Sequence, residues 1–161
     1  ERIIRRKFNP TNKIFRKIHK KCGTTESYTN STVLCHFLHY VLDFKKSNEE
    51  LRIPKWVFDS PDSVKRAYLH EAYAMEGTIF KSLSEIRFIT KDFNYAKDLQ
   101  KLLLRLGITA IVKGRLGGIH RTQQYRISIY RKENFREFKK IGFSMPMHVE
   151  RFDRLCNKYG I

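Results

Sequence analysis

The order in which hydrophobic periodicity changes after Pro61 constrains the fold of this chain more than any other feature of its sequence. Apolar residues recur at helical spacing from Pro61 to about Met75, Gly77 breaks the pattern, and two short segments with strand alternation follow, TIF and SEIRFIT. Asp59 or Ser60 is a candidate N-cap, and Pro61 suits the first helical position. We therefore predict a helix followed by two strands.

The same order recurs further along the chain. Asp92 caps a strongly amphipathic segment that ends at Gly107, and two more strands follow, ITAIVK and TQQYRISIY, joined by the glycine-containing loop GRLGGIHR. The last two predicted helices are ENFREFKKIG and VERFDRLCNKYG. Helix, two strands, helix, two strands and closing helices together describe an α+β domain with an antiparallel sheet.

The first 58 residues predict a shorter version of this order. We interpret ERIIRRKF as a short basic strand and PTNKIFRKIHKKC as a helix that ends at Gly23. TTESYTN is a polar connector with room for a short strand, and Ser31 caps a core helix, TVLCHFLHYVLDF. After the loop KKSNEEL, the segment RIPKWVFDSP is predicted to be non-helical because Pro54 and Pro61 interrupt it.

Charge restricts the partners of this chain. Its 33 Lys and Arg residues against 16 Asp and Glu residues give a net charge of +17, while 41% hydrophobic content predicts a folded domain. A nucleic acid is favoured over a membrane, because no apolar run approaches the roughly 18 residues of a spanning helix. A basic surface that serves only solubility is the alternative. No signal peptide is visible, and three widely spaced cysteines indicate an intracellular, reducing compartment such as the cytoplasm or an organelle matrix.

Four segments occur in an order that is typical of a known family. Along the chain they are LRIPKWVF, AYLHEAYAMEGTI, DLQKLLLRLGI and YRISIYRKENFREFKKIGF. They resemble, in turn, the Ile-Pro connector, the motif helix with its closing acid–glycine pair, the helix before the second hairpin, and the final strand, helix and Ile-Gly-Phe ending of the LAGLIDADG homing endonucleases. The similarity covers roughly residues 50–145, and STVLCHFLHYVL extends it upstream.

The resemblance implies a LAGLIDADG-like αββαββα saddle whose concave antiparallel sheets straddle DNA. It divides the chain into a partial first repeat, residues 1–58, and a complete second repeat with closing helices, residues 59–161. The first repeat begins after the point where its own motif helix would lie. We therefore expect an upstream segment or a second subunit to complete the fold.

The acid at the end of the motif helix is the candidate catalytic centre. A carboxylate at a helix C-terminus lies unfavourably against the negative end of the macrodipole. The resemblance implies that two such acids hold Mg²⁺ between the scissile phosphates, which makes Glu76 a candidate metal ligand and catalytic residue. Lys91 is a candidate for positioning the metal-bound water or a phosphate. For both residues the alternative is an exposed charge at a helix end.

Two departures from the family pattern leave the activity open. The second acid is missing from this chain, and the small residues through which motif helices touch are replaced by Glu71 and Met75. One hypothesis is a Mg²⁺-dependent, site-specific DNA endonuclease. The other is a non-catalytic derivative that binds DNA or RNA as a ribonucleoprotein or ribosome component, a splicing cofactor or a regulator.

Candidate nucleic-acid contacts fall into four groups. Polar residues of the strands alternate with apolar ones and could share one face, where Arg and Gln can pair with guanine and adenine edges. Cations in the turns and on the first predicted helix would reach phosphates. The strand group is Arg87, Thr109, Lys113, Gln124, Arg126 and Ser128; the second hairpin tip holds Arg115, His120 and Arg121; the first hairpin turn holds Lys81; and the helix group is Lys13, Arg16, Lys17, Lys20 and Lys21.

Overall fold

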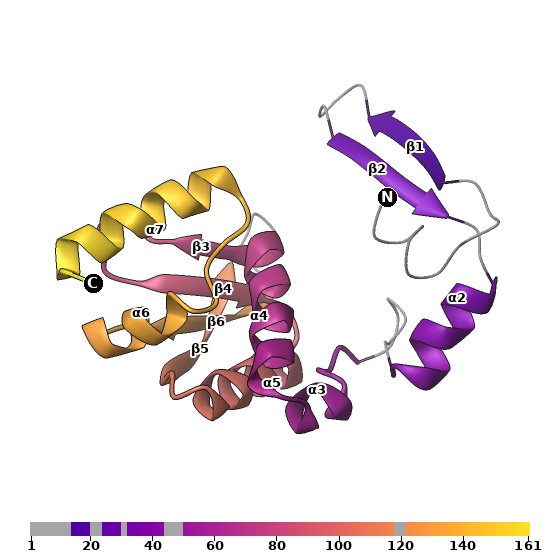
Figure 1. Cartoon of the computed structure of the whole chain (residues 1–161), viewed down its shortest axis with the longest axis horizontal. Coiled ribbons are helices and arrows are strands. Elements are labelled where there is room, and N and C mark those ends of the chain that lie inside the picture. The colour runs from indigo at the N-terminus through magenta and orange to yellow at the C-terminus, as the bar shows by residue number, and fades with distance from the viewer. Residues whose placement is uncertain (1–13, 20–23, 30–31, 44–49, 118–121) are drawn as a thin grey trace. The chain divides into compact units, whose positions relative to one another are not determined.

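A computed structural model describes residues 14–19, 24–29, 32–43, 50–117 and 122–161 of the chain (Figure 1). The chain divides into two compact units, Glu1–Lys46 and Ser47–Ile161. Each unit is described below by itself.

The second unit has the element order that the sequence predicts after residue 61. Helix, two strands, helix, two strands and two closing helices follow one another, preceded by one additional short helix. The elements are α3 (Lys55–Asp59), α4 (Asp62–Glu76), β3 (Gly77–Ile79), β4 (Ile86–Thr90), α5 (Phe93–Arg105), β5 (Ala110–Gly117), β6 (Thr122–Ile129), α6 (Lys132–Phe138) and α7 (Pro146–Tyr159).

The four strands form one antiparallel sheet in the order β3-β4-β6-β5 (Figure 1). The two hairpins thus join through β4 and β6, whose register pairs Phe88 with Ile127 and Ile86 with Ile129. These four side chains are buried, as the alternation of the strands predicts, and they form one face of the core.

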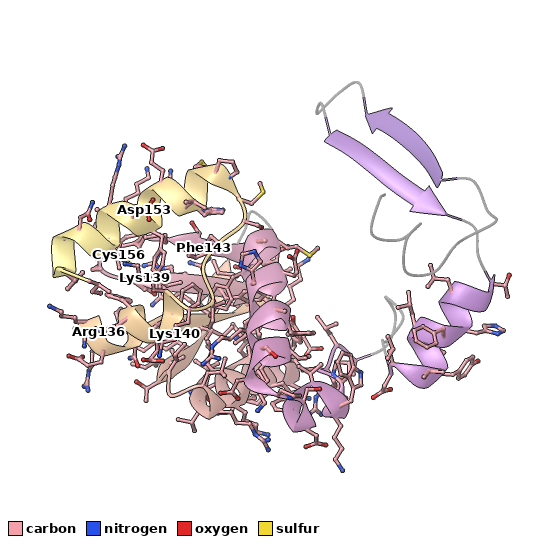
Figure 2. The ribbon with its side chains drawn as sticks, viewed as in Figure 1. Arg136, Lys139, Lys140, Phe143, Asp153 and Cys156 are labelled. Atoms are coloured by element: carbon pink, nitrogen blue, oxygen red, sulfur yellow. The ribbon has the colours of Figure 1, made fainter. Side chains whose placement is uncertain are left out.

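The helices of the second unit cover this apolar face. Tyr73 of α4 is fully buried, and its ring meets Phe138 at 5.0 Å and Phe88 at 5.3 Å between centroids. Phe143, labelled in Figure 2, packs on Tyr73 and on Phe152 of α7, so it joins α4 to α7. Edge-on aromatic contacts of this kind add about 0.5–1.5 kcal/mol each beyond the area that they bury.

The predicted caps set the ends of two helices. Asp92 precedes α5, and its Oδ1 accepts a hydrogen bond from the backbone N–H of Tyr95 at 2.9 Å, which confirms its predicted role. Pro61 lies at the N-cap of α4, one position before the predicted one. The start of α4 therefore has no side-chain cap, and neither Asp59 nor Ser60 serves as one.

The prediction of a non-helical connector before α4 is wrong, because α3 (Lys55–Asp59) is a short helix. Pro54 is its N-cap and Pro61 follows its end, so neither proline lies where it would remove a helical hydrogen bond. The connector belongs to the second unit. Asp98 of α5 accepts from Arg52 Nε at 2.7 Å, and Arg105 donates to the Phe58 carbonyl at 2.8 Å. The boundary between the compact units lies after residue 46, while the division of the chain into two repeats at residue 58 stays a prediction.

The first unit contains a hairpin and a helical segment. The strands β1 (Ile14–His19) and β2 (Thr24–Thr29) are antiparallel, and α2 (Thr32–His36) continues into a π-helix, η1 (Phe37–Val41). The predicted helix over residues 32–44 is confirmed as helical through Val41. The predicted cap Ser31, the strand of residues 1–8 and most of the loop KKSNEEL lie outside the described residues.

The predicted helix PTNKIFRKIHKKC is wrong, because its described part is the strand β1. Ile14 and Ile18 share a face at helical spacing and also at strand spacing, so the pattern alone does not separate the two structures. The partner strand decides: six consecutive residues of β1 pair with β2, from Ile14 opposite Thr29 to His19 opposite Thr24. The connector TTESYTN has room for a short strand, as expected, and contains the whole of β2.

Candidate nucleic-acid interface

The second face of the four-stranded sheet carries the polar residues that the sequence predicts to lie together. Residues directly opposite each other in an antiparallel pair share a face. Ser128 lies opposite Arg87 on one side and Ile111 on the other, and Arg126 lies between Ile89 and Lys113. The polar face is therefore defined by the residues Arg87, Ile89, Ile111, Lys113, Arg115, Gln124, Arg126 and Ser128.

This polar face is open in the second unit. Ile111 is 49% exposed on it, although an isoleucine would be buried if a helix covered this side of the sheet. Lys113 and Arg115 are exposed as well, and Arg87, Gln124 and Arg126 are at least partly exposed. The strand register thus places Arg87, Lys113, Gln124 and Arg126 of the predicted strand group on a common face, and their contact with a nucleic acid stays a prediction.

Arg115 extends the polar face beyond its predicted limit. The sequence places this residue in the hairpin tip, but β5 continues to Gly117, and Arg115 lies opposite Gln124. Its Nη2 donates to Gln124 Oε1 at 3.3 Å. The loop prediction fails here because the glycines at 114 and 117 read as a turn, whereas pairing with β6 holds them in the strand.

Two predicted contacts are engaged in hydrogen bonds within the protein. The prediction that Ser128 contacts a nucleic acid is wrong, because only 2% of this residue is exposed. Its hydroxyl donates to Glu85 Oε1 at 2.5 Å beneath the polar face. Thr109 precedes β5 and is exposed, but its hydroxyl and backbone N–H both donate to Asn134 Oδ1 of α6. Asn134 returns a hydrogen bond to Thr109 Oγ1 at 2.9 Å.

Glu85 is the functional candidate that the sequence reasoning missed. It precedes β4 on the polar face, as strand alternation predicts, yet it is 3% exposed. Its Oε2 lies 2.6 Å from Arg87 Nη2, and its Oε1 lies 3.8 Å from Arg126 Nε. The sequence could have revealed it, because Glu85 is two residues from Arg87 and strand alternation therefore places this acid on a face that is otherwise rich in cations.

Glu76, Lys91 and Gln124 come together although they belong to separate parts of the chain. Glu76 is the last residue of α4, Lys91 follows β4 and Gln124 lies on β6. All three line a cavity of about 460 Å³, and Glu76 and Lys91 are exposed. The remaining lining residues are Leu51, Ala72, Met75, Phe88, Ile89, Thr90 and Tyr95.

The glycine after Glu76 allows the helix to turn directly into a strand. Gly77 is the C-cap of α4 and the first residue of β3, with extended backbone angles. A Cβ atom there would lie 2.3 Å from the Tyr73 carbonyl oxygen. Glu76 is therefore held at the edge of the sheet by a turn that only glycine permits without a backbone shift.

The residues that replace the small positions of the motif helix are on its outer side. Met75 is 82% exposed and Glu71 is also exposed, while Leu69 and Tyr73 form the buried side of α4. Lys81 is exposed in the turn between β3 and β4, at the opposite end of that hairpin from Glu76.

The predicted cationic helix face of the first unit is not formed. Arg16 and Lys17 are consecutive residues of strand β1 rather than members of a helix. The other members of that group, Lys13, Lys20 and Lys21, lie outside the described residues, as do His120 and Arg121 of the second hairpin tip.

The chemistry of the cavity fits part of a magnesium site. Mg²⁺ takes one or two carboxylates together with waters and phosphate oxygens. Glu76 is the one carboxylate among the described residues that line the cavity, so it can supply a single protein ligand. Within the ranges that the structure describes, no three His, Cys, Asp or Glu side chains converge as a complete metal site.

No helix in the described part of the chain is long and apolar enough to cross a membrane.

Comparison with known proteins agrees with the resemblance in the sequence. Residues 63–142 match the family described as LAGLIDADG-like domain. The chain is 23% identical over 129 residues to a probable translation initiation factor IF-2 of Methanocaldococcus jannaschii, with 78% of this chain and 11% of that protein covered. It is 31% identical over 140 residues to the replication factor C small subunit of the same organism, with 86% of this chain and 7% of that protein covered.

The chain thus spans about a tenth of the length of these curated relatives. A translation initiation factor and a replication factor have unrelated named activities, so the shared segment does not explain either of them.

The fold resembles that of I-DmoI, a homing endonuclease. The structure of I-DmoI in complex with DNA and Mn aligns with a TM-score of 0.64 and 16% sequence identity, covering 87% of this chain and 68% of that one. Other I-DmoI structures contain Mg or Ca together with DNA. At this level of identity the comparison establishes the mixed helix and antiparallel sheet fold.

Proposed function

Residues 63–142 make this chain a member of the LAGLIDADG-like domain family, and from that premise we propose that it binds double-stranded DNA through the polar face of its four-stranded sheet. The observation that carries the proposal is the strand register. It aligns Arg87, Lys113, Arg115, Gln124 and Arg126 on one open side of the sheet.

The residue types on this face suit both parts of DNA recognition. Exposed Lys113 and Arg115 would neutralise phosphates, and each neutralised phosphate makes binding more salt-dependent. Arg126 and Gln124 have the donors and acceptors that pair with guanine and adenine edges in the major groove. I-DmoI, which has the same fold, has been crystallised with DNA, and this supports DNA over RNA as the partner.

Salt-dependent binding to a random-sequence DNA duplex tests the proposal. A variant with Lys113, Arg115 and Arg126 changed to Gln should bind more weakly, with a salt slope smaller by up to about 0.9 for each phosphate that is no longer neutralised. The control changes Arg136, Lys139 and Lys140 to Gln, which removes the same charge from α6 and the residues after it (Figure 2). Equal weakening in both variants would mean that the protein binds DNA only through its net charge.

Glu76 is proposed as one ligand of a divalent cation beside this surface. When bound, Mg²⁺ would activate water and stabilise the oxygens of a phosphodiester under displacement. Lys91, which lines the same cavity, would attract the phosphate, and Gln124 would hydrogen-bond it or a neighbouring base edge. The second acid of a two-acid centre would come from a second copy of the chain or from residues outside those described.

Cleavage of supercoiled DNA in Mg²⁺ separates an endonuclease from a binding protein. If the parent cuts and Glu76→Gln does not, although it still binds the same duplex, the chain is an endonuclease. Binding without cutting in both proteins supports the non-catalytic alternative, which the single carboxylate among the described lining residues favours. The same duplex offered as RNA decides whether the partner is DNA.

We also propose that the protein works in a reducing intracellular compartment. Cys35 is exposed and carries a free thiol, and Cys156 is buried and free. Free exposed thiols persist where the environment keeps them reduced. A ratio of reduced to oxidised Cys35 measured by thiol labelling of the native protein tests this placement.

A further inference from the structure

We infer that Glu85 is a positioning residue that sets the sequence preference of the polar face, by holding Arg87 and Arg126 in place to read guanines. This inference rests on the proposed function. Glu85 is negatively charged, whereas the other charged residues described on the polar face are cations.

The burial of Glu85 requires an explanation. A carboxylate with 3% exposure has lost its water, which is costly unless cations and hydrogen-bond donors replace it. Glu85 immediately precedes β4. Its backbone carbonyl accepts a hydrogen bond from the Phe80 N–H at 2.9 Å, and this bond closes the β3–β4 hairpin. Its backbone is therefore anchored, and its side chain lies under the polar face rather than in solvent.

Three side chains lie around the two carboxylate oxygens. Arg87 Nη2 lies 2.6 Å from Oε2, and the Ser128 hydroxyl donates to Oε1 at 2.5 Å. Arg126 Nε lies 3.8 Å from the same Oε1, close enough for an ion pair but too far for a hydrogen bond. Ser128 lies opposite Arg87 and two residues after Arg126 on β6, so its hydrogen bond to Glu85 connects the residue before β4 to β6 below the surface.

The guanidinium of Arg87 is held from a second side. Its central carbon lies 3.7 Å from the centre of the Phe80 ring, within the range of a cation–π contact. An arginine that an aromatic ring and a carboxylate both orient loses less rotamer freedom when it binds a ligand. Its planar donors are then presented in one orientation, as the bidentate pairing with guanine O6 and N7 requires.

Both arginines keep unsatisfied donors. The Nε atoms of Arg87 and Arg126 are buried and lack a hydrogen-bond acceptor among the described residues. An Nε atom that is closed to solvent is out of reach of a base edge, so a guanine would pair with the terminal Nη donors of these arginines. Arg87 and Arg126 are diagonal neighbours on adjacent strands, roughly 7–8 Å apart at their Cα atoms and somewhat less at Cβ, which is close to two base-pair steps.

The negative charge has opposite effects on affinity and on specificity. Two arginines and one glutamate leave a net charge of +1 at this place, so Glu85 weakens the attraction of any DNA for the face. The same carboxylate restricts the arginines to one geometry. Removing its charge should therefore strengthen binding to DNA of any sequence and weaken the preference for guanine. A merely structural glutamate would not produce these two opposite changes.

Selection from randomised DNA duplexes tests the inference. We expect sequences selected by the parent to carry guanine at two positions within about three base pairs. Glu85→Gln, which keeps the shape of the side chain, should bind random duplex several-fold more tightly and lose the preference at both positions. Arg87→Lys and Arg126→Lys should each lose one of them, and Arg136→Lys on α6 should lose neither.

Two further variants separate positioning from charge and from folding. Glu133→Gln adds the same charge on α6, where Glu133 is exposed, and should leave the selected sequence unchanged. Ser128→Ala removes the hydrogen bond to Glu85 without a change of charge, and should weaken the preference without tighter binding. It gives the decisive result if Glu85→Gln proves unfolded by thermal denaturation.

The outcomes are distinct. An unchanged guanine preference in folded Glu85→Gln, or in Ser128→Ala where Glu85→Gln is unfolded, overturns the role of Glu85 while the DNA-binding proposal stands. A parent that binds no duplex overturns the proposed function, and the inference with it. A parent whose selected sequences show no guanine pair also overturns the inference.

Discussion

The two faces of the four-stranded sheet are built from the same strands and behave as opposites. In β6, Ile127 and Ile129 are fully buried against the helices, while Arg126, the residue between Tyr125 and Ile127, lies on the open side. One face gains free energy by excluding water, and the other keeps charges within reach of a ligand. Alternation along a strand therefore separates stability from binding residue by residue.

This separation fails at two residues of the sheet. Glu85 and Ser128 belong to the polar face by parity, yet both are buried, because they hydrogen-bond to each other beneath the arginines. Holding the arginines of the polar face in fixed places requires buried polar residues beneath them, here Glu85 and Ser128. Changes at these two residues should affect binding and stability together, whereas changes elsewhere should affect one of them.

The largest expected loss of stability comes from a substitution on the apolar face. Phe138 is fully buried and its ring lies 5.0 Å from that of Tyr73. Phe138→Ala should lower the free energy of unfolding by about 3–5 kcal/mol, because it removes apolar contacts and leaves a cavity. Urea denaturation measures this loss. Ile111→Ala on the polar face is the control and should change stability by less than about 0.5 kcal/mol; a similar loss in both would contradict the division between faces.

A smaller loss of stability is expected from a substitution at the junction between α4 and β3. Gly77→Ala would bring a Cβ atom to 2.3 Å from a backbone oxygen, which cannot move independently of α4. We expect a loss of about 1–3 kcal/mol in denaturant titration. Gly114→Ala in β5 is the matched control, since its nearest neighbour is the flexible end of Gln123. The interpretation fails if the two alanines are tolerated equally.

A change on the polar face should leave stability unaltered. Lys113 is exposed and has no burial to lose, so Lys113→Gln should unfold at the same urea concentration as the parent. Its affinity for duplex DNA should fall a few-fold, with a salt slope lower by about 0.9 if Lys113 neutralises one phosphate in the parent complex. Lys140→Gln, on the residues after α6, gives the comparison for simple removal of charge (Figure 2). Identical decreases in affinity would argue against a localised interface.

The smallest expected effect is a change of stability with pH, caused by His148 of α7, one of the helices that cover the apolar face. Burial, and secondarily the nearby Arg151, lowers the pKa of His148, whose ring packs on Phe143. The folded protein thus binds a proton less readily than the unfolded chain, and stability should fall as pH drops below about 6.5 towards the lower folded pKa. The difference between parent and His148→Gln in thermal denaturation should shrink on acidification; a constant difference would contradict this assignment.

Local sequence determined the second unit in most respects. Periodicity, the cap at Asp92 and the break at Gly77 predict the order of α4, β3, β4, α5, β5, β6, α6 and α7, because each signal depends on residues within one or two turns of each other. Strand alternation also places Arg87, Lys113 and Arg126 on one face. The same signals were insufficient for Ile14–His19, whose apolar spacing fits a helix and a strand equally well.

Only the tertiary structure decided the features that involve distant partners. Pairing with β2 turns residues 14–19 into a strand, and pairing with β6 keeps Arg115 in β5. Glu85 and Ser128 are 43 residues apart, and Glu76, Lys91 and Gln124 reach one cavity from three separate parts of the chain. Such contacts depend on where non-neighbouring strands and helices pack, and no local pattern records that, so burial of a charge and convergence of a site emerge only when the chain is folded.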